Sequence, residues 1–272
     1  MRYSILPVAF LFCLSLIFVV PSQAQSLGPA TLRQVSAAQP ETEPAMTPRQ
    51  LAELRGDIYM ARKMFPEAIK SYQQLIKEEP RNAELLNKLG IAYEGFRNDG
   101  DAERAYKRAI KADKTYASAY NNVGTVEYDR HKYSHAIEWY QKTLALRPDM
   151  AAVHYNLGCA YFDSKKYPEA MDAFQHAIQL DPHVMSANGS GGSVVQPRGT
   201  SDQGLFYFLV ARTYAQMGNA ERCAHYLKMA RDVGYEKFVS AKTDSTFSKV
   251  IADPQVQAVF VPVPELANSK PH

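Results

Sequence analysis

The sequence has little cysteine and little excess charge of either sign. Its 272 residues include three cysteines, and the formal net charge is +3. Three cysteines cannot build a disulfide framework. So weak a basic balance argues against nucleic-acid binding, because phosphate neutralisation needs lysine and arginine concentrated on one surface. The basic residues from Arg104 to Lys114 recur at helical spacing among acidic ones. We expect a solvated helix face there, with a patch for an acidic partner as the alternative.

Long hydrophobic runs are also scarce, and the single one extends from Ile5 to Val20, behind Arg2. Ser22 and Ala24 follow it at the spacing that a signal peptidase recognises. We therefore expect a signal peptide at 1–24, cleaved after Ala24, and an exported mature chain, periplasmic or secreted, with no membrane span. An uncleaved membrane anchor is the alternative, because the run is long for a signal and short for a span.

No arrangement of residues typical of catalysis or of metal binding occurs. His131 and His135 are four residues apart, but the repeat described below places them across a turn, and the acidic residue of the helical metal motif is missing. Cys159 has no histidine at a neighbouring register, and Cys223 occupies a small-residue position where an inert buried thiol is expected. We expect no catalytic residue, metal or cofactor. A disulfide between the two cysteines of the mature chain is an alternative.

The sequence does contain a repeat of 34 residues, in four units without insertions that start at Arg49, Ala83, Ala117 and Ala151. The eighth place is always glycine, the twentieth always alanine and the twenty-fourth always aromatic. These residues are Gly56, Gly90, Gly124 and Gly158, then Ala68, Ala102, Ala136 and Ala170, then Tyr72, Tyr106, Tyr140 and Phe174. Three units close with proline at the thirty-second place. A period of this length is typical of stacked helix pairs.

The repeated glycine needs a compensating contact, because glycine inside a helix costs about 1 kcal/mol relative to alanine. We expect the glycine turn of one helix to face the alanine of the next, twelve places later, with the aromatic side chain beside that contact. The proline then ends the second helix. The first helix is expected to start at Thr47, whose side chain can form a capping box with Gln50.

The pattern resembles the tetratricopeptide repeat family, over more than half the chain. The segments "NKLGIAY", "YNNVGTVEY" and "YNLGCAY" carry its glycine and tyrosine positions. Arg55, Glu127 and Lys114 depart from the pattern, and Arg55 suits the outer face of a first repeat. The resemblance implies an all-α fold, a right-handed solenoid of helical hairpins with four regular repeats, a fifth degraded repeat and C-terminal capping helices.

The other segments are assigned around the four repeats, which span residues 47–184. Residues 25–46 are expected to be a disordered linker, and 262–272 a disordered tail. The Gly/Ser-rich segment 185–203 is either a flexible surface loop or a flap over a binding groove. Residues 204–261 hold the fifth repeat and the C-terminal cap, which must cover the last repeat's hydrophobic face.

The resemblance also implies a function, because first helices in this family line a concave groove. The matching places here hold amide, aromatic and small polar side chains: Asn87, Asn121, Asn122, Thr125, Tyr128, Tyr155, Asn156, Cys159 and Phe162. Asparagine can hydrogen-bond the backbone of an extended peptide, and aromatic rings can contact its side chains. We expect a non-catalytic scaffold or adaptor of the cell envelope that binds a peptide or protein partner in this groove. The alternatives are an assembly subunit that self-associates through the solenoid ends or convex face and, less favoured, an enzyme accessory domain; the oligomeric state stays open.

Overall fold

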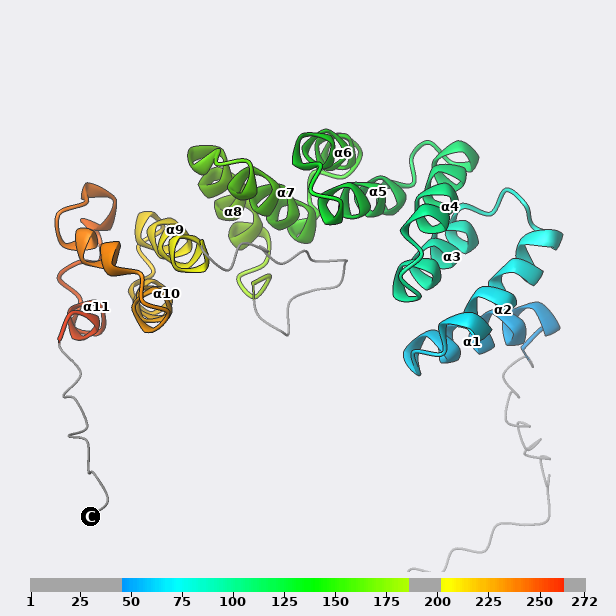
Figure 1. Ribbon diagram of the computed structural model, residues 1–272, viewed down its shortest axis with the longest axis horizontal. Helices are drawn as coiled ribbons and strands as arrows, with labels where there is room; N and C mark the ends of the chain where they lie inside the picture. Colours follow the sequence, from blue (N-terminus) through cyan, green and yellow to red (C-terminus); the bar gives the residue numbers. More distant parts are fainter. Residues whose placement is uncertain (1–45, 186–201, 262–272) are drawn as a thin grey trace, which may run out of the picture. The chain divides into compact units, whose positions relative to one another are not determined.

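The structure, a computed structural model, describes residues 46–185 and 202–261, which belong to a compact unit that begins at Met46. In these two ranges the chain forms eleven α-helices, two short 3-10 helices and no strand. The first eight helices are α1 (Pro48–Ala61), α2 (Phe65–Glu78), α3 (Ala83–Gly95), α4 (Asp99–Ala112), α5 (Ala117–Asp129), α6 (Tyr133–Leu146), α7 (Ala151–Asp163) and α8 (Tyr167–Leu180). They form four pairs, and the second helix of each pair also packs against the first helix of the next (Figure 1). The expected all-α helix-pair repeat is confirmed.

A fifth pair and a cap follow. The pair consists of α9 (Gln203–Gln216) and α10 (Ala220–Asp232), and the cap consists of η1 (Glu236–Lys242), η2 (Ser245–Phe247) and α11 (Pro254–Val259). The cap buries apolar side chains against α9 and α10: Ala241, Phe247, Val250, Val256 and Val259. It thereby covers the hydrophobic face of the fifth pair, as the sequence predicted.

Local signals account for the helix ends. At the start of α1, the Thr47 N–H donates to Gln50 Oε1 at 2.8 Å and the Gln50 N–H donates to Thr47 Oγ1 at 3.2 Å, so the expected capping box is confirmed. The turn inside each pair places the fifteenth residue of the repeat in the left-handed region, with φ between 56° and 60° at Lys63, Arg97, His131 and Lys165. The fifth pair has Gly218 at the same place, with φ of 76°. Glycine adopts this conformation without a steric penalty, whereas the same conformation costs free energy at the other four residues.

The repeated glycines face aromatic rings. A Cβ built on Gly158 would lie 2.4 Å from Phe174 Cε1, and one on Gly90 would lie 2.3 Å from Tyr106 Cε1. Gly56 and Gly124 face the aromatic residue of their own repeat in the same way. The aromatic ring that was expected beside the contact of glycine and alanine is thus the nearest neighbour of each glycine. The ring of the second helix lies directly on the glycine turn, because only a missing side chain leaves room for it.

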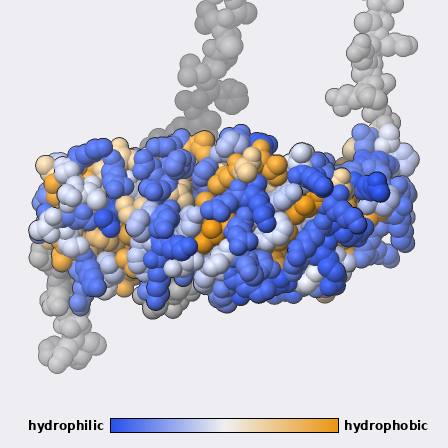
Figure 2. Space-filling model, turned by 90° about the horizontal axis from the view of Figure 1, so that it is seen from above, coloured by the Kyte–Doolittle hydropathy of each residue, from blue (hydrophilic) through white to orange (hydrophobic). Residues whose placement is uncertain are grey.

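Apolar side chains are buried along the whole series of helix pairs. Hydrophilic residues cover most of the face shown in Figure 2, with hydrophobic patches between them. Cys159 and Cys223 are both buried and form no disulfide with each other, so that alternative is not realised. Within the described ranges, no helix combines the length and the apolar character needed to cross a membrane. The predicted signal peptide, linker and tail, and most of the Gly/Ser-rich segment, lie outside the described residues.

Candidate partner-binding face

The nine predicted partner-binding residues lie on the first helices α3, α5 and α7, and all nine are buried. None is more than 5% exposed. The structure brings them together across three consecutive repeats, but it places them against other side chains of the chain. Their role as partner contacts stays a prediction.

Four asparagines form a continuous chain of hydrogen bonds from α7 to α3. Asn156 Nδ2 donates to Asn121 Oδ1 at 3.2 Å, Asn121 Nδ2 donates to Asn122 Oδ1 at 3.1 Å, and Asn122 Nδ2 donates to Asn87 Oδ1 at 2.9 Å. Two of these bonds join residues that are 35 positions apart, one repeat plus one place. We call these four residues the asparagine ladder. A primary amide both donates and accepts, so each rung can link two neighbours.

The aromatic members of the predicted set pack into the core. Tyr155 lies 5.6 Å from the Phe174 ring, and Phe162 lies 5.4 Å from the Phe206 ring, measured between centroids. Tyr128 donates a hydrogen bond from its hydroxyl to the Asp163 carboxylate. The Tyr155–Phe174 contact lies within one helix pair, whereas Phe162 with Phe206 and Tyr128 with Asp163 link successive pairs. Sequence spacing alone did not reveal these contacts.

Hydroxyl groups of the second helices reach polar groups on the first helices. Tyr72 donates to Asp57 Oδ1 at 2.6 Å, and Tyr106 donates to Glu94 Oε2 at 2.8 Å. Burial raises the pKa of the Glu94 carboxyl, and the nearby charge of Asp129 adds to that effect, although the Tyr106 hydrogen bond opposes it. Glu94 therefore pays a desolvation cost when it is ionised.

The thiols are poor nucleophiles. Burial raises the pKa of Cys159, and it raises the pKa of Cys223 to about 12. The thiolate is the reactive form, so both groups are inert near neutral pH. Within 46–185 and 202–261, no three His, Cys, Asp or Glu side chains are grouped as a metal site would require.

The face of the first helices is more open at α1 and α3 and carries acidic groups there. Lys88 Nζ lies 2.8 Å from Glu53 Oε1, 3.0 Å from Asp57 Oδ2 and 3.7 Å from Glu84 Oε1. One lysine thus bridges two repeats and faces three carboxylates. Ile91 lies on the same helix and is 36% exposed.

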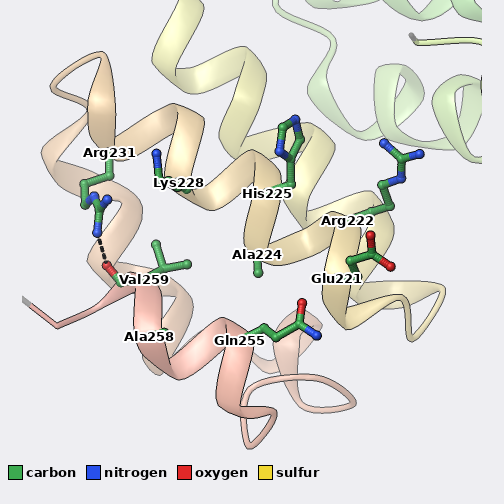
Figure 3. Close-up of a pocket in the computed structure, with 9 residues that line it drawn as sticks. All are labelled: Glu221, Arg222, Ala224, His225, Lys228, Arg231, Gln255, Ala258 and Val259. Atoms are coloured by element: carbon green, nitrogen blue, oxygen red, sulfur yellow. Dashed lines mark hydrogen bonds between the residues drawn. The ribbon is translucent and has the colours of Figure 1, made fainter. Parts of the chain in front are cut away.

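The sequence reasoning missed a pocket of about 540 Å³ between α10 and α11. Figure 3 shows its two sides: α10 supplies the basic residues Arg222, His225, Lys228 and Arg231, and α11 supplies Gln255, Ala258 and Val259. Arg231 Nη1 donates to the Val259 carbonyl at 2.9 Å and so fixes α11 beside α10. Lys228 and Arg231 also pair with Asp232, which offsets part of the positive charge. The recurrence of basic residues along α10 was visible in the sequence, but the position of α11 was not.

The comparisons with known proteins agree with the helix pairs. A sequence model described as "Tetratricopeptide repeat" matches residues 151–184, and one described as "TPR repeat" matches residues 56–95 and 124–164. These matches fall on the first four pairs, where glycine and aromatic ring interlock in each repeat. The chain is a tetratricopeptide-repeat protein. No curated protein sequence matches it.

Several solved structures are similar to the chain. A crystal structure of MamA is 25% identical, with 67% of this chain and 95% of that chain covered and a TM-score of 0.47. MamA from Desulfovibrio magneticus RS-1 is 18% identical, with 71% and 99% covered and a TM-score of 0.49. YrrB, a TPR protein with an unusual peptide-binding site, is 15% identical, with 71% and 91% covered and a TM-score of 0.45. TM-scores below 0.5 do not establish a shared overall fold, so the family rests on the sequence models and the repeats.

Proposed function

We propose that the chain is a non-catalytic scaffold of the cell envelope that binds a peptide or protein partner along its first helices. Stacked helix pairs suit this function, because each added repeat extends one continuous binding surface. The observation that carries the proposal is the asparagine ladder, which crosses three repeats on the helices where the family resemblance places a partner.

The ladder is satisfied within the chain: among the described residues, no buried side-chain nitrogen or oxygen lacks a hydrogen-bond partner. Burying an amide costs free energy unless all its hydrogen bonds are formed, whereas apolar residues at the same places would carry no such requirement. Buried polar networks can also fix a unique arrangement of neighbouring elements. We propose that the ladder fixes the relative positions of α3, α5 and α7, and that a partner binds beside it, at the more exposed places on α1 and α3 that include Lys88 and Ile91.

Photo-crosslinking tests this proposal without removing a buried side chain. A photoreactive amino acid replaces Ile91, which lies on the first-helix face, or Lys107, whose side chain is 53% exposed on the second helix α4. We expect irradiation of envelope preparations to give a discrete adduct at position 91 and none at position 107. Adducts formed at position 107 alone would move the binding surface to the second helices and overturn the proposal.

Export is the second part of the proposal and rests on the sequence from Arg2 to Ala24. The hydrophobic run followed by Ser22 and Ala24 supports cleavage before Gln25. Amino-terminal sequencing of the protein purified from the envelope should therefore begin at Gln25. A sequence that begins at Met1 would indicate an uncleaved anchor.

A further inference from the structure

The first helix carries an exposed apolar stripe. Leu51, Leu54 and Ile58 are 48%, 42% and 40% exposed, respectively. They occupy the third, sixth and tenth places of the first repeat, spacing that puts three side chains on one face of a helix. We call these three residues the α1 stripe.

The other regular repeats bury the third and tenth places, whereas the sixth place of the second repeat is Lys88, whose side chain is 24% exposed. At the third and tenth places they carry Leu85, Ala119 and Val153, then Ala92, Val126 and Ala160, none more than 1% exposed. Each of the helices α3, α5 and α7 packs on its own second helix and also on the pair before it. The helix α1 has its own second helix too, so the difference comes from the preceding pair. The α1 stripe therefore corresponds to the surface that packs on a preceding helix pair in the other repeats, and within the described residues no helix pair precedes α1.

The sequence before α1 does not continue the repeat. In the same register, Gln34 and Ala38 stand where the other units have alanine and an aromatic residue, and Pro40 falls at the twenty-sixth place. Proline in a helix interior removes a hydrogen bond and clashes with the preceding turn. The residues that lead into α1 thus lack the signature of the second helix that this surface fits.

The charges beside the α1 stripe favour an acidic occupant. Within the described ranges, Arg55, Arg62 and Lys63 take part in no ion pair, whereas the carboxylates of Glu53 and Asp57 are engaged by Lys88. Arg49 is paired with Glu53 and Glu79. The charged residues that line the pocket between α1 and α2 are Arg49, Arg55 and one acidic residue, Glu78. The positive side chains that remain available flank the apolar surface.

The same charges disfavour a second copy of this chain. An antiparallel two-fold contact centred on Leu54 brings the Arg55 side chains of the two copies together, and like charges at an interface oppose association. We propose that the α1 stripe is a docking site for a partner's amphipathic helix, whose apolar face is flanked by acidic side chains. This helix takes the place of a preceding second helix.

Two synthetic amphipathic peptides test the proposal. They share one leucine stripe, flanked by glutamate in the first and by lysine in the second, and each carries a fluorescent label for anisotropy titration with the full mature chain. We expect the glutamate peptide to saturate at micromolar concentration and to bind at least about tenfold more tightly than the lysine peptide. The variant Leu51→Gln/Ile58→Gln should lose binding, and Arg55→Glu should reverse the preference.

The matched control is Leu180→Gln on α8, because Leu180 is 47% exposed and lies far along the chain from α1. This variant should bind both peptides as the unchanged chain does, and all variants should keep their Tm. Three results would each overturn the proposal: no saturable binding of the glutamate peptide, binding that ignores the α1 changes, or no effect of Arg55→Glu. If the molecular mass of the unchanged chain rose with protein concentration and that of Leu51→Gln/Ile58→Gln did not, the occupant of the stripe would be a second copy of this chain. If the glutamate peptide bound only after deletion of residues 25–45, the occupant of the stripe would be that segment of this chain.

Discussion

Replacing Gly158 with alanine tests the packing that defines this fold. The added Cβ would lie 2.4 Å from Cε1 and 2.5 Å from Cδ1 of Phe174. Ordinary carbon contacts are about 3.5–4.0 Å, so the ring must retreat by about 1 Å. Phe174 is fully buried and packs against the rings of Tyr155 and Phe206, with centroids 5.6 Å and 5.7 Å away. Movement of the ring therefore requires these neighbouring rings to shift as well.

The magnitude follows from two opposing effects. Overpacking a well-packed core costs about 1–3 kcal/mol, and the tight surroundings of Phe174 place this case near the upper end. Alanine regains about 1 kcal/mol of helix propensity over glycine. We therefore expect Gly158→Ala to lower the free energy of unfolding by about 2 kcal/mol. For a chain of this size that corresponds to a Tm lower by about 4–8 °C.

Gly100→Ala is the matched control, because Gly100 lies in α4 and its nearest neighbour, Arg104 Nη1, is 3.9 Å from the ideal Cβ position. This change should stabilise the chain by about 0.4–1 kcal/mol. Urea unfolding followed by circular dichroism measures both variants. If Gly158→Ala were as stabilising as Gly100→Ala, the close contact of ring and glycine would be refuted.

Three further predictions concern the turns, the asparagine ladder and a buried carboxyl. Lys165→Gly should raise the free energy of unfolding by about 0.5–1 kcal/mol, and Gly218→Ala should lower it by about 1 kcal/mol, because the backbone is left-handed at both positions. A Cβ on Gly218 would meet nothing within 4 Å, so the backbone conformation alone causes the loss. Changes of the opposite sign in urea unfolding would contradict this reasoning. Asn122→Ala should lower the free energy of unfolding by about 1–3 kcal/mol, because it removes the hydrogen-bond partner of the Asn87 and Asn121 amides. The control Lys107→Ala should be nearly neutral. Equal Tm values for the two variants would refute the ladder. Burial raises the pKa of Glu94 above its ordinary value of 4.5, so its contribution to stability is present below pH 4.5 and is lost as the pH rises through the folded-state pKa. The variant Glu94→Gln should therefore gain stability relative to the unchanged chain between pH 4 and pH 7, and an identical difference in Tm at both pH values would contradict the shift.

Local spacing was sufficient to predict the repeats. The period, the helix start at Thr47 and the cap after the fifth pair depend on residues that are near one another in sequence, and all three are confirmed. Capping and turn formation involve backbone groups within a few residues, so a single sequence carries the information. Spacing did not predict that the aromatic ring would be the nearest neighbour of the glycine, because alanine and aromatic ring both lie on the facing helix and only the crossing of the two helices decides which one lies closest.

Burial, by contrast, was decided only by the tertiary structure. The amide character of Asn121, Asn122 and Asn156 could be read from the sequence, but their burial depends on neighbours one repeat away. Leu51 and Leu85 also show that the sequence did not determine burial. They occupy the same place in two successive repeats, yet Leu51 is exposed and Leu85 is buried. The sequence determined which side chain stands at each place of the repeat. Its contact with solvent was determined by whether another helix pair packs on that place, because solvent exposure is a property of the assembled neighbours.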